Sequence, residues 1–299
     1  MLYPSRLTIR EALESVSKNV YVLPPIQRAF VCNPEHICRL FEGLMRGRPL
    51  GTFLFWRIAP EQTARFKFYG FLQHYHQRDA PHCPELHELP DAELSAVIDG
   101  QQRLTALNIG LRGSMALEER GTWRAHRNAF PRKVLHLDLL AGNANLFRFK
   151  DPERAHAGRG SLWYPVPGVL ETTNTAALMQ WLTTAFQQRG LGSQHFPQAA
   201  STLQRLYEVV HTAPAIPFHS EQSRQLDRDV RVFLRLNDAC SLTFRLVASF
   251  GFEQNISQVE SGLLPIAYYL FKRNPPDTWL FTPASQAERD QIRSWLTRS

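Results

Sequence analysis

The sequence predicts an α+β fold in which a domain of mixed strands and helices is followed by a mainly helical domain. In the first half, β-rich runs such as residues 50–58 and 134–140 alternate with helical patterns, whereas later apolar residues recur mostly at helical spacing. Residues 141–170, rich in glycine and proline, separate the two regions. We therefore expect a first domain over residues 1–140, a linker region over 141–170 and a helical domain over 171–299.

The composition of the 299-residue chain limits its class. With 43% hydrophobic and 20% charged residues it can bury a sizeable core, and global disorder is excluded. No apolar run reaches the roughly 20 residues of a membrane-spanning helix, and charged residues interrupt the N-terminus where a secretion signal would be apolar. No CxxC pair occurs, so we expect a cytoplasmic protein with free thiols at Cys32, Cys38, Cys83 and Cys240.

The N-terminal elements follow from capping residues and periodicity. Thr8 and Glu11 form a capping box, which predicts a helix over about residues 9–17. A short strand over residues 21–23 ends at two prolines. Asn33 caps the next helix, which starts at Pro34 and ends at Gly47. Its apolar face consists of Ile37, Leu40, Phe41, Leu44 and Met45.

The middle of the chain predicts a sheet with an insertion. Residues 50–58 are too apolar for an exposed strand, so we place them inside the sheet. Residues 59–93 are rich in aromatic residues and histidine, and two prolines beside Cys83 disfavour a metal-binding helix, so we favour a packed subdomain over a metal site. Residues 94–98 form a strand that runs into a helix.

The second half predicts four helices. Their apolar residues fall in residues 178–186, 203–210, 226–234 and 256–273, and Pro265 is expected to interrupt the last helix.

Positive charge is concentrated in one stretch. The formal net charge is +7, and residues 100–160 carry 11 basic and 5 acidic residues. This stretch, with Trp123 and Phe130 interleaved, is typical of a nucleic-acid surface, although an arginine-rich proteome would also raise the charge. The candidate DNA-binding residues are Arg120, Arg124, Arg127, Arg132 and Lys133.

Residues 99–103, Asp-Gly-Gln-Gln-Arg, are the main candidate for chemistry. A tight turn from strand to helix leaves main-chain N–H groups that favour an anion, and glycine allows close approach. Asp99 could hold a divalent cation or orient water, and Arg103 could contact phosphate. The alternative is a capping box in which Asp99 caps the helix and Gln102 completes it.

Two further polar segments have both functional and structural interpretations. Two prolines precede Gln27 and Arg28 and fix their direction, although an ordinary loop explains them equally well. Residues 233–237 end at Asn237, which is also a plain helix cap.

These segments together resemble one known family. Residues 97–105, VIDGQQRLT, resemble the signature of the DGQQR family, the N-terminal domain of GmrSD-type restriction endonucleases, which is similar to the ParB/sulfiredoxin fold. Three shorter segments resemble the family's P-x-x-Q-R, G-x-P-[IL]-G and F-x-R-[ILV]-N motifs and extend the resemblance over residues 5–250: LPPIQRAF, GRPLG and FLRLN.

The resemblance implies an NTPase coupled to restriction of phage DNA with modified bases. It implies a nucleoside triphosphate and Mg²⁺ as cofactors, with catalytic residues Asp99, Gln102 and Arg103, and Asp99 as the metal ligand. The nucleotide-binding residues implied are Gln27, Arg28, Gly100, Gln101, Thr105 and Asn237.

The sequence departs from the family after Asn237. Glycines expected there are absent, and the Leu-Thr pair at residues 242–243 comes early with no acidic residue after it. No histidine follows Leu246, so we expect a His-metal nuclease to come from a partner chain. The alternatives are a DNA-binding or modification-sensing module without catalysis, an inactive family member, and a ParB-like nuclease at Asp99.

Overall fold

The computed structural model describes residues 5–24, 30–31, 33–63, 66–119, 129–142, 146–153, 160–221, 238–251 and 260–296. The chain divides into two compact units, residues 1–222 and residues 223–299, and each is described by itself. Mixed sheets in the first unit confirm the α+β class.

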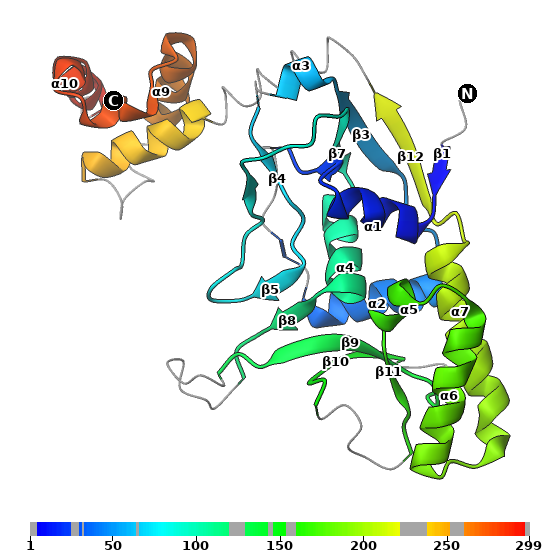
Figure 1. Cartoon of the computed structure of the whole chain (residues 1–299). Helices are drawn as coiled ribbons and strands as arrows, with labels where there is room; N and C mark the ends of the chain where they lie inside the picture. Colours follow the sequence, from blue (N-terminus) through cyan, green and yellow to red (C-terminus); the bar gives the residue numbers. More distant parts are fainter. Residues whose placement is uncertain are drawn as a thin grey trace. The chain divides into compact units, whose positions relative to one another are not determined.

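A five-stranded sheet with the order β1-β12-β3-β7-β2 forms one side of the first unit (Figure 1). β3 pairs parallel to β12 and antiparallel to β7, so the sheet is mixed, and β3 and β7 are both interior strands. The strands are β1 (Ser5–Leu7), β2 (Tyr21–Val22), β3 (Phe53–Ile58), β7 (Leu94–Asp99) and β12 (Ile216–Glu221).

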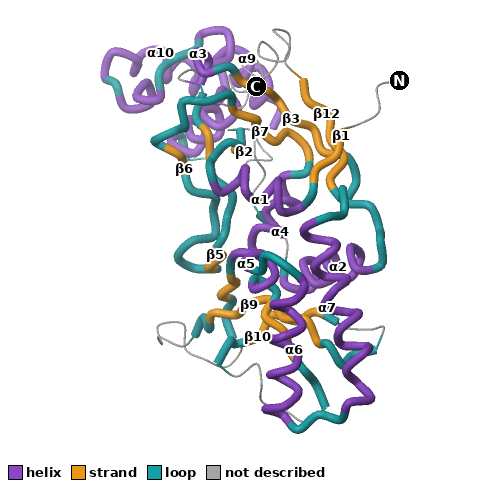
Figure 2. Tube along the Cα trace, turned by 45° about the vertical axis from the view of Figure 1, so that its right-hand side comes forward, coloured by secondary structure: helices purple, strands orange, loops and turns teal. Residues whose placement is uncertain are grey.

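A second sheet with the order β10-β9-β8-β5, to which β11 adds by pairing with β9, lies on the side of α6 and α7 (Figure 2). Its strands are β5 (His74–His76), β8 (Ser114–Ala116), β9 (Arg132–Asp138), β10 (Phe147–Lys150) and β11 (Trp163–Pro165). The predicted aromatic insertion contains a two-stranded sheet of β4 (Phe68–Tyr69) and β6 (Glu85–Leu86).

The helix α4 (Gln101–Arg112) connects the two sheets (Figure 1). All eight residues from Leu104 to Leu111 are buried, which is typical of a helix enclosed by protein on every side. The helices that pack in the same unit are α1 (Ile9–Ser17), α2 (Pro34–Met45), α3 (Pro60–Thr63), α5 (Gly168–Glu171), α6 (Thr175–Arg189) and α7 (Phe196–His211).

Local signals predicted the N-terminal helices correctly. The side chain of Thr8 accepts a hydrogen bond from the Glu11 N–H, and Asn33 accepts one from the His36 N–H ahead of α2. Gly47 has φ of 73°, the left-handed conformation expected after α2.

The domain boundary lies further along the chain than the sequence indicated. Residues 141–170, expected as a linker, contribute β10, β11 and most of α5 to the first unit. Buried residues of α6 and α7 join the same core as α1 and α4, and β12 then enters the central sheet. The two helices therefore belong to the first unit, which ends at about residue 222.

The second unit has its own helical core. Residues 238–249, α9 (Glu260–Arg273) and α10 (Gln286–Leu296) are helical. Pro265 lies inside α9, so the expected interruption there was wrong, and the helix predicted over residues 226–234 lies outside the described residues. In the ranges that the structure describes, no helix has the length and apolar character needed to cross a membrane.

Candidate functional site

The strand β7 ends at Asp99, and α4 starts two residues later. Gly100 between them has φ of 96° and ψ of 0°, a left-handed conformation that other residues rarely adopt. A Cβ atom at this position would lie 2.1 Å from Cδ1 of Phe53, which is fully buried in β3. Both the backbone angle and the neighbouring ring therefore require glycine at position 100.

The first turn of α4 receives no cap from the side chain of its own N-cap residue. The N-cap residue is Gly100, and it makes no side-chain hydrogen bond. The alternative in which Asp99 and Gln102 form a capping box was therefore wrong. Because Gly100 has a positive φ, it becomes the N-cap residue in place of Asp99. Gly100 has no side chain that could accept a hydrogen bond from the helix N–H groups. The first turn of a helix carries partial positive charge, which attracts anions.

The carboxylate of Asp99 is accessible to solvent. Its side chain is 71% exposed, and Oδ2 lies 3.2 Å from Nη2 of Arg103, one helical turn away. An exposed ion pair of this kind contributes about 0–1 kcal/mol, so it competes weakly with a cation or a water molecule. Asp99 is therefore an accessible carboxylate oxygen donor at the edge of the helix terminus, of the kind that divalent cations bind.

Arg103 is held in place by the loop that precedes β3. Nη1 donates a hydrogen bond to the main-chain oxygen of Leu50, and Nη2 donates to that of Thr52 at 3.1 Å. The guanidinium also lies over the Phe53 ring, 4.6 Å from its centroid. Gly51, with φ of 76°, leaves room for this approach, because a Cβ there would be 2.6 Å from Nη1 of Arg103.

This structural role of Arg103 was missed by sequence reasoning. Its acceptors, Leu50 and Thr52, are about 50 residues away in the chain, so no pattern near Arg103 indicates them. Gly51, between the two acceptors, is the one feature of that loop that could have suggested a close approach. The same contacts fix the guanidinium beside Asp99, so its charge is positioned before any ligand arrives.

Three other predicted residues lie in the first turns of α4. The Gln101 side-chain amide donates to the main-chain oxygens of Val97 at 2.8 Å and Ile98 at 3.3 Å, so it secures the end of β7. Thr105 is 3% exposed, and its hydroxyl donates to the Gln101 oxygen. Gln102 accepts a hydrogen bond from the Val31 N–H at 3.2 Å.

The contact between Val31 and Gln102 brings the segment after Arg28 to the start of α4. Gln27, Arg28 and Asn237 themselves lie outside the described residues, so their place at this site stays a prediction.

The predicted DNA-binding stretch is only partly described. Arg120, Arg124 and Arg127 lie outside the described residues, whereas Arg132 and Lys133 begin β9. Lys133 Nζ lies 2.7 Å from Oε1 of Glu119. Lys133 also borders a cavity of about 630 Å³, whose charged lining consists of three basic and four acidic side chains: Arg39, Lys133, Arg148, Glu35, Glu42, Glu118 and Glu119. This described part of the stretch is therefore mixed in charge rather than basic.

The thiols are free where they are described, at Cys38, Cys83 and Cys240. Burial, aided by the nearby Glu42 and Glu35 carboxylates, raises the pKa of Cys38 to about 12, which makes this thiol a poor nucleophile. Among the described residues, no group of three or more His, Cys, Asp or Glu side chains could hold a metal ion. A cation at Asp99 would therefore need ligands from the nucleotide, water or other parts of the chain.

A comparison of the sequence with known proteins identifies the family of this chain. No curated protein matches the sequence. The family described as GmrSD restriction endonuclease, N-terminal domain, matches over residues 9–240, which is more than half of the chain. This range contains β7, Gly100 and α4 as well as the loop that holds Arg103. The chain therefore belongs to the family of GmrSD restriction endonuclease N-terminal domains.

Proposed function

We propose that this chain binds and hydrolyses a nucleoside triphosphate with Mg²⁺ at residues 98–104, as a component of a system that restricts modified DNA. The observation that carries the proposal is a helix terminus whose N-cap residue is a left-handed glycine, beside an exposed carboxylate and a fixed guanidinium. The family supplies the link to DNA restriction. A nuclease would be supplied by a partner chain.

The residues at this corner suit a magnesium nucleotide. Main-chain N–H groups at the start of α4 would donate to phosphate oxygens, and Gly100 lets the phosphates approach the backbone. Asp99 would hold Mg²⁺, which supplies charge neutralisation of the phosphates. Gln102 would orient a water molecule, and Gln27, Arg28 and Asn237 would line the remaining part of the site.

Arg103 contributes a charge that needs no rearrangement. Its contacts with Leu50 and Thr52 hold the guanidinium close to Asp99. A pre-positioned positive charge stabilises the negative charge that develops on transferred phosphate oxygens, because little reorganisation is needed.

The direct test measures phosphate release from each of the four NTPs with Mg²⁺, using the full chain and Asp99→Ala. We expect one or more NTPs to be hydrolysed by the wild type, and at least a tenfold loss in the variant, which corresponds to about 1.4 kcal/mol or more of lost transition-state stabilisation.

Glu93→Ala is the matched control. Glu93 lies just before β7 and is exposed over 41% of its side chain, against 71% for Asp99. It pairs with Arg57 at 2.7 Å, so this variant also removes a surface carboxylate and its ion pair. Full activity in Glu93→Ala, with loss in Asp99→Ala, supports the assignment. No hydrolysis by the wild type, or equal rates in all three proteins, contradicts it. Salt-sensitive DNA binding that persists in an inactive chain would support the sensing module instead.

A further inference from the structure

A separate cavity of about 310 Å³ lies between β1, the loop from α2 to β3, and α7. Its charged lining consists of three arginines, one from each of these elements: Arg6, Arg48 and Arg205. The rest of the lining is apolar or main chain, and it includes Leu44, Val209 and the prolines at positions 49, 214 and 217. We call this cavity the three-arginine pocket.

In the described part of the chain, little negative charge compensates the three guanidinium groups. None of the described residues that line the pocket carries a carboxylate. Within the described ranges, the side chains of Arg6 and Arg48 make no hydrogen bond or ion pair. Like charges around one cavity repel each other, and an anion between them would remove that cost.

Arg205 is the oriented member of the set. Its Nε donates to the main-chain oxygen of Met45, the last residue of α2, at 3.3 Å. Its Nη1 lies 3.7 Å from Glu208, in an exposed pair that contributes about 0–1 kcal/mol and so neutralises little of the charge. The main-chain contact holds the guanidinium at the wall of the pocket.

These features suit a phosphate as ligand. The planar fork of arginine pairs with phosphate oxygens through two parallel hydrogen bonds, and several arginines around one anion suit its multiple oxygens. A volume near 300 Å³ matches the lower end of small-ligand sites.

We propose that the three-arginine pocket binds a phosphate ester, presented by the DNA backbone or by a free phosphorylated molecule. The pocket shares no lining residue with the Asp99 corner, so this proposal goes beyond the proposed NTPase and does not depend on it. It would also provide a phosphate-binding surface outside β9, where Lys133 is paired with Glu119.

The experiment uses the full chain without NTP or Mg²⁺, so that its outcome is independent of hydrolysis. One arm measures binding of pyrophosphate by calorimetry, and the other measures binding of a fluorescent DNA duplex by anisotropy at several salt concentrations. The variants are Arg6→Gln and Arg48→Gln, because neither side chain makes a contact on which the described fold depends. Arg39→Gln is the control, since Arg39 is an exposed arginine of α2 outside the pocket and the charge change is the same.

We expect a loss of about tenfold in affinity for each pocket variant and little change for the control. A loss with DNA, together with a fall of about one in the slope of log affinity against log salt, identifies the DNA backbone as the source. A loss with pyrophosphate alone identifies a free phosphate ester. Equal effects in all three variants, or no binding in either arm, overturn the proposal.

Discussion

Gly100 shows most directly how one residue shapes the candidate site. Its left-handed backbone ends β7 and starts α4 within one residue, and the buried Phe53 ring occupies the space a side chain would need. Because the N-cap residue is then a glycine, the residue that makes the turn has no side chain of its own to cover the N–H groups at the helix start. The structural and functional requirements coincide at this position.

Gly100→Ala tests this coincidence through stability. Both the left-handed angle and the contact with Phe53 oppose the new methyl group, so we expect a loss of about 2–4 kcal/mol in the free energy of unfolding. Gly190→Ala is the control, because Gly190 also has positive φ, 58°, but nothing lies within 4 Å of its Cβ position; we expect a loss of about 1 kcal/mol there. Urea unfolding measures both. Equal losses would show that the Phe53 contact contributes nothing.

The candidate site could be predicted in part from its residues. The strand, the turn and the helix at residues 94–112 follow from apolar periodicity and glycine, and the structure confirms them. The capping of α4 was not predictable, because Asp-x-x-Gln fits a capping box until the φ of Gly100 is known. The attachment of Arg103 to Leu50 and Thr52 depends on tertiary structure, which no local pattern encodes.

At the scale of elements, caps and apolar periodicity predicted α1 and α2, whereas pairing at long range was missed. β12 has the sequence IPFHSE, and its last three residues are exposed. Its alternation of apolar and polar residues is too short to indicate a strand. It forms because β1 and β3 lie on either side and provide main-chain partners. The domain boundary was misplaced for the same reason, since this strand returns to the first sheet after two helices that look like a separate domain.

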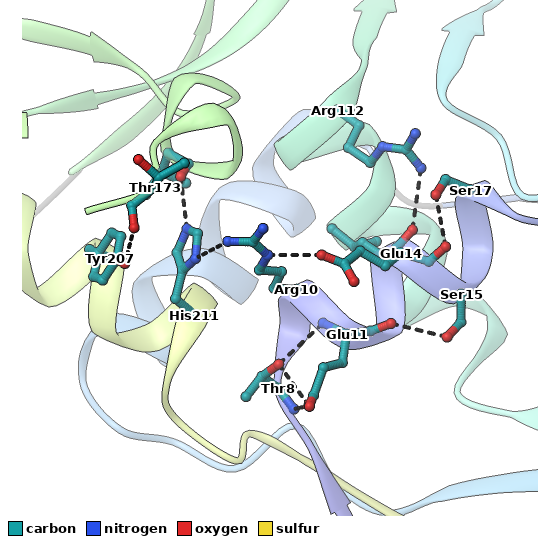
Figure 3. A network of polar contacts seen from close by, with 12 residues as sticks. Thr8, Arg10, Glu11, Glu14, Ser15, Ser17, Arg112, Thr173, Tyr207 and His211 are labelled. Carbon is teal, nitrogen blue, oxygen red and sulfur yellow. Dashed lines mark hydrogen bonds and ion pairs between the residues drawn. The ribbon is translucent and has the colours of Figure 1, made fainter. Parts of the chain in front are cut away.

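The packing of α1 against α7 contains a polar network that depends on pH (Figure 3). His211 on α7 lies 2.8 Å from the Val169 oxygen through Nε2 and 3.1 Å from Nη1 of Arg10 through Nδ1. Since arginine only donates, Nδ1 must accept, and the ring is neutral with its proton on Nε2. Arg10 in turn pairs with Glu14 at 2.8 Å.

Acid is therefore expected to weaken this contact. Burial, with a contribution from Arg10, lowers the pKa of His211 below its ordinary value of 6.5, although the Val169 and Glu14 oxygens oppose the shift. The unfolded chain then binds the proton more readily, so stability is full above about pH 6.5 and falls as the pH decreases through that value toward the folded-state pKa. Glutamine keeps a donor and an acceptor but does not titrate. We therefore expect His211→Gln to lose less free energy of unfolding than the wild type between about pH 7.5 and pH 5.5. Urea unfolding at these pH values measures the difference, and identical losses would remove His211 as the cause.

At the scale of the whole molecule, the two units have separate hydrophobic cores. The first core contains residues from Ile9 to Ile216, and the second contains residues from Ala239 to Leu296. No described residue belongs to both. The family match nevertheless extends to residue 240, past the end of the first unit, and takes in Asn237. The first folding unit and the matched family range therefore end at different residues in this chain.

A fragment of residues 1–222 separates these boundaries experimentally. Because its core is complete, we expect circular dichroism and thermal unfolding to show a cooperative transition at nearly the temperature of the same transition in the full chain. Because it lacks Asn237, which we assign to the nucleotide site, we expect it to lose NTP hydrolysis while it stays folded.

A fragment of residues 1–240 is the comparison, since it restores the matched family range and would regain hydrolysis if the missing segment completes the site. A non-cooperative 1–222 fragment would show that the second unit is needed for folding, and an active one would remove Asn237 from the site.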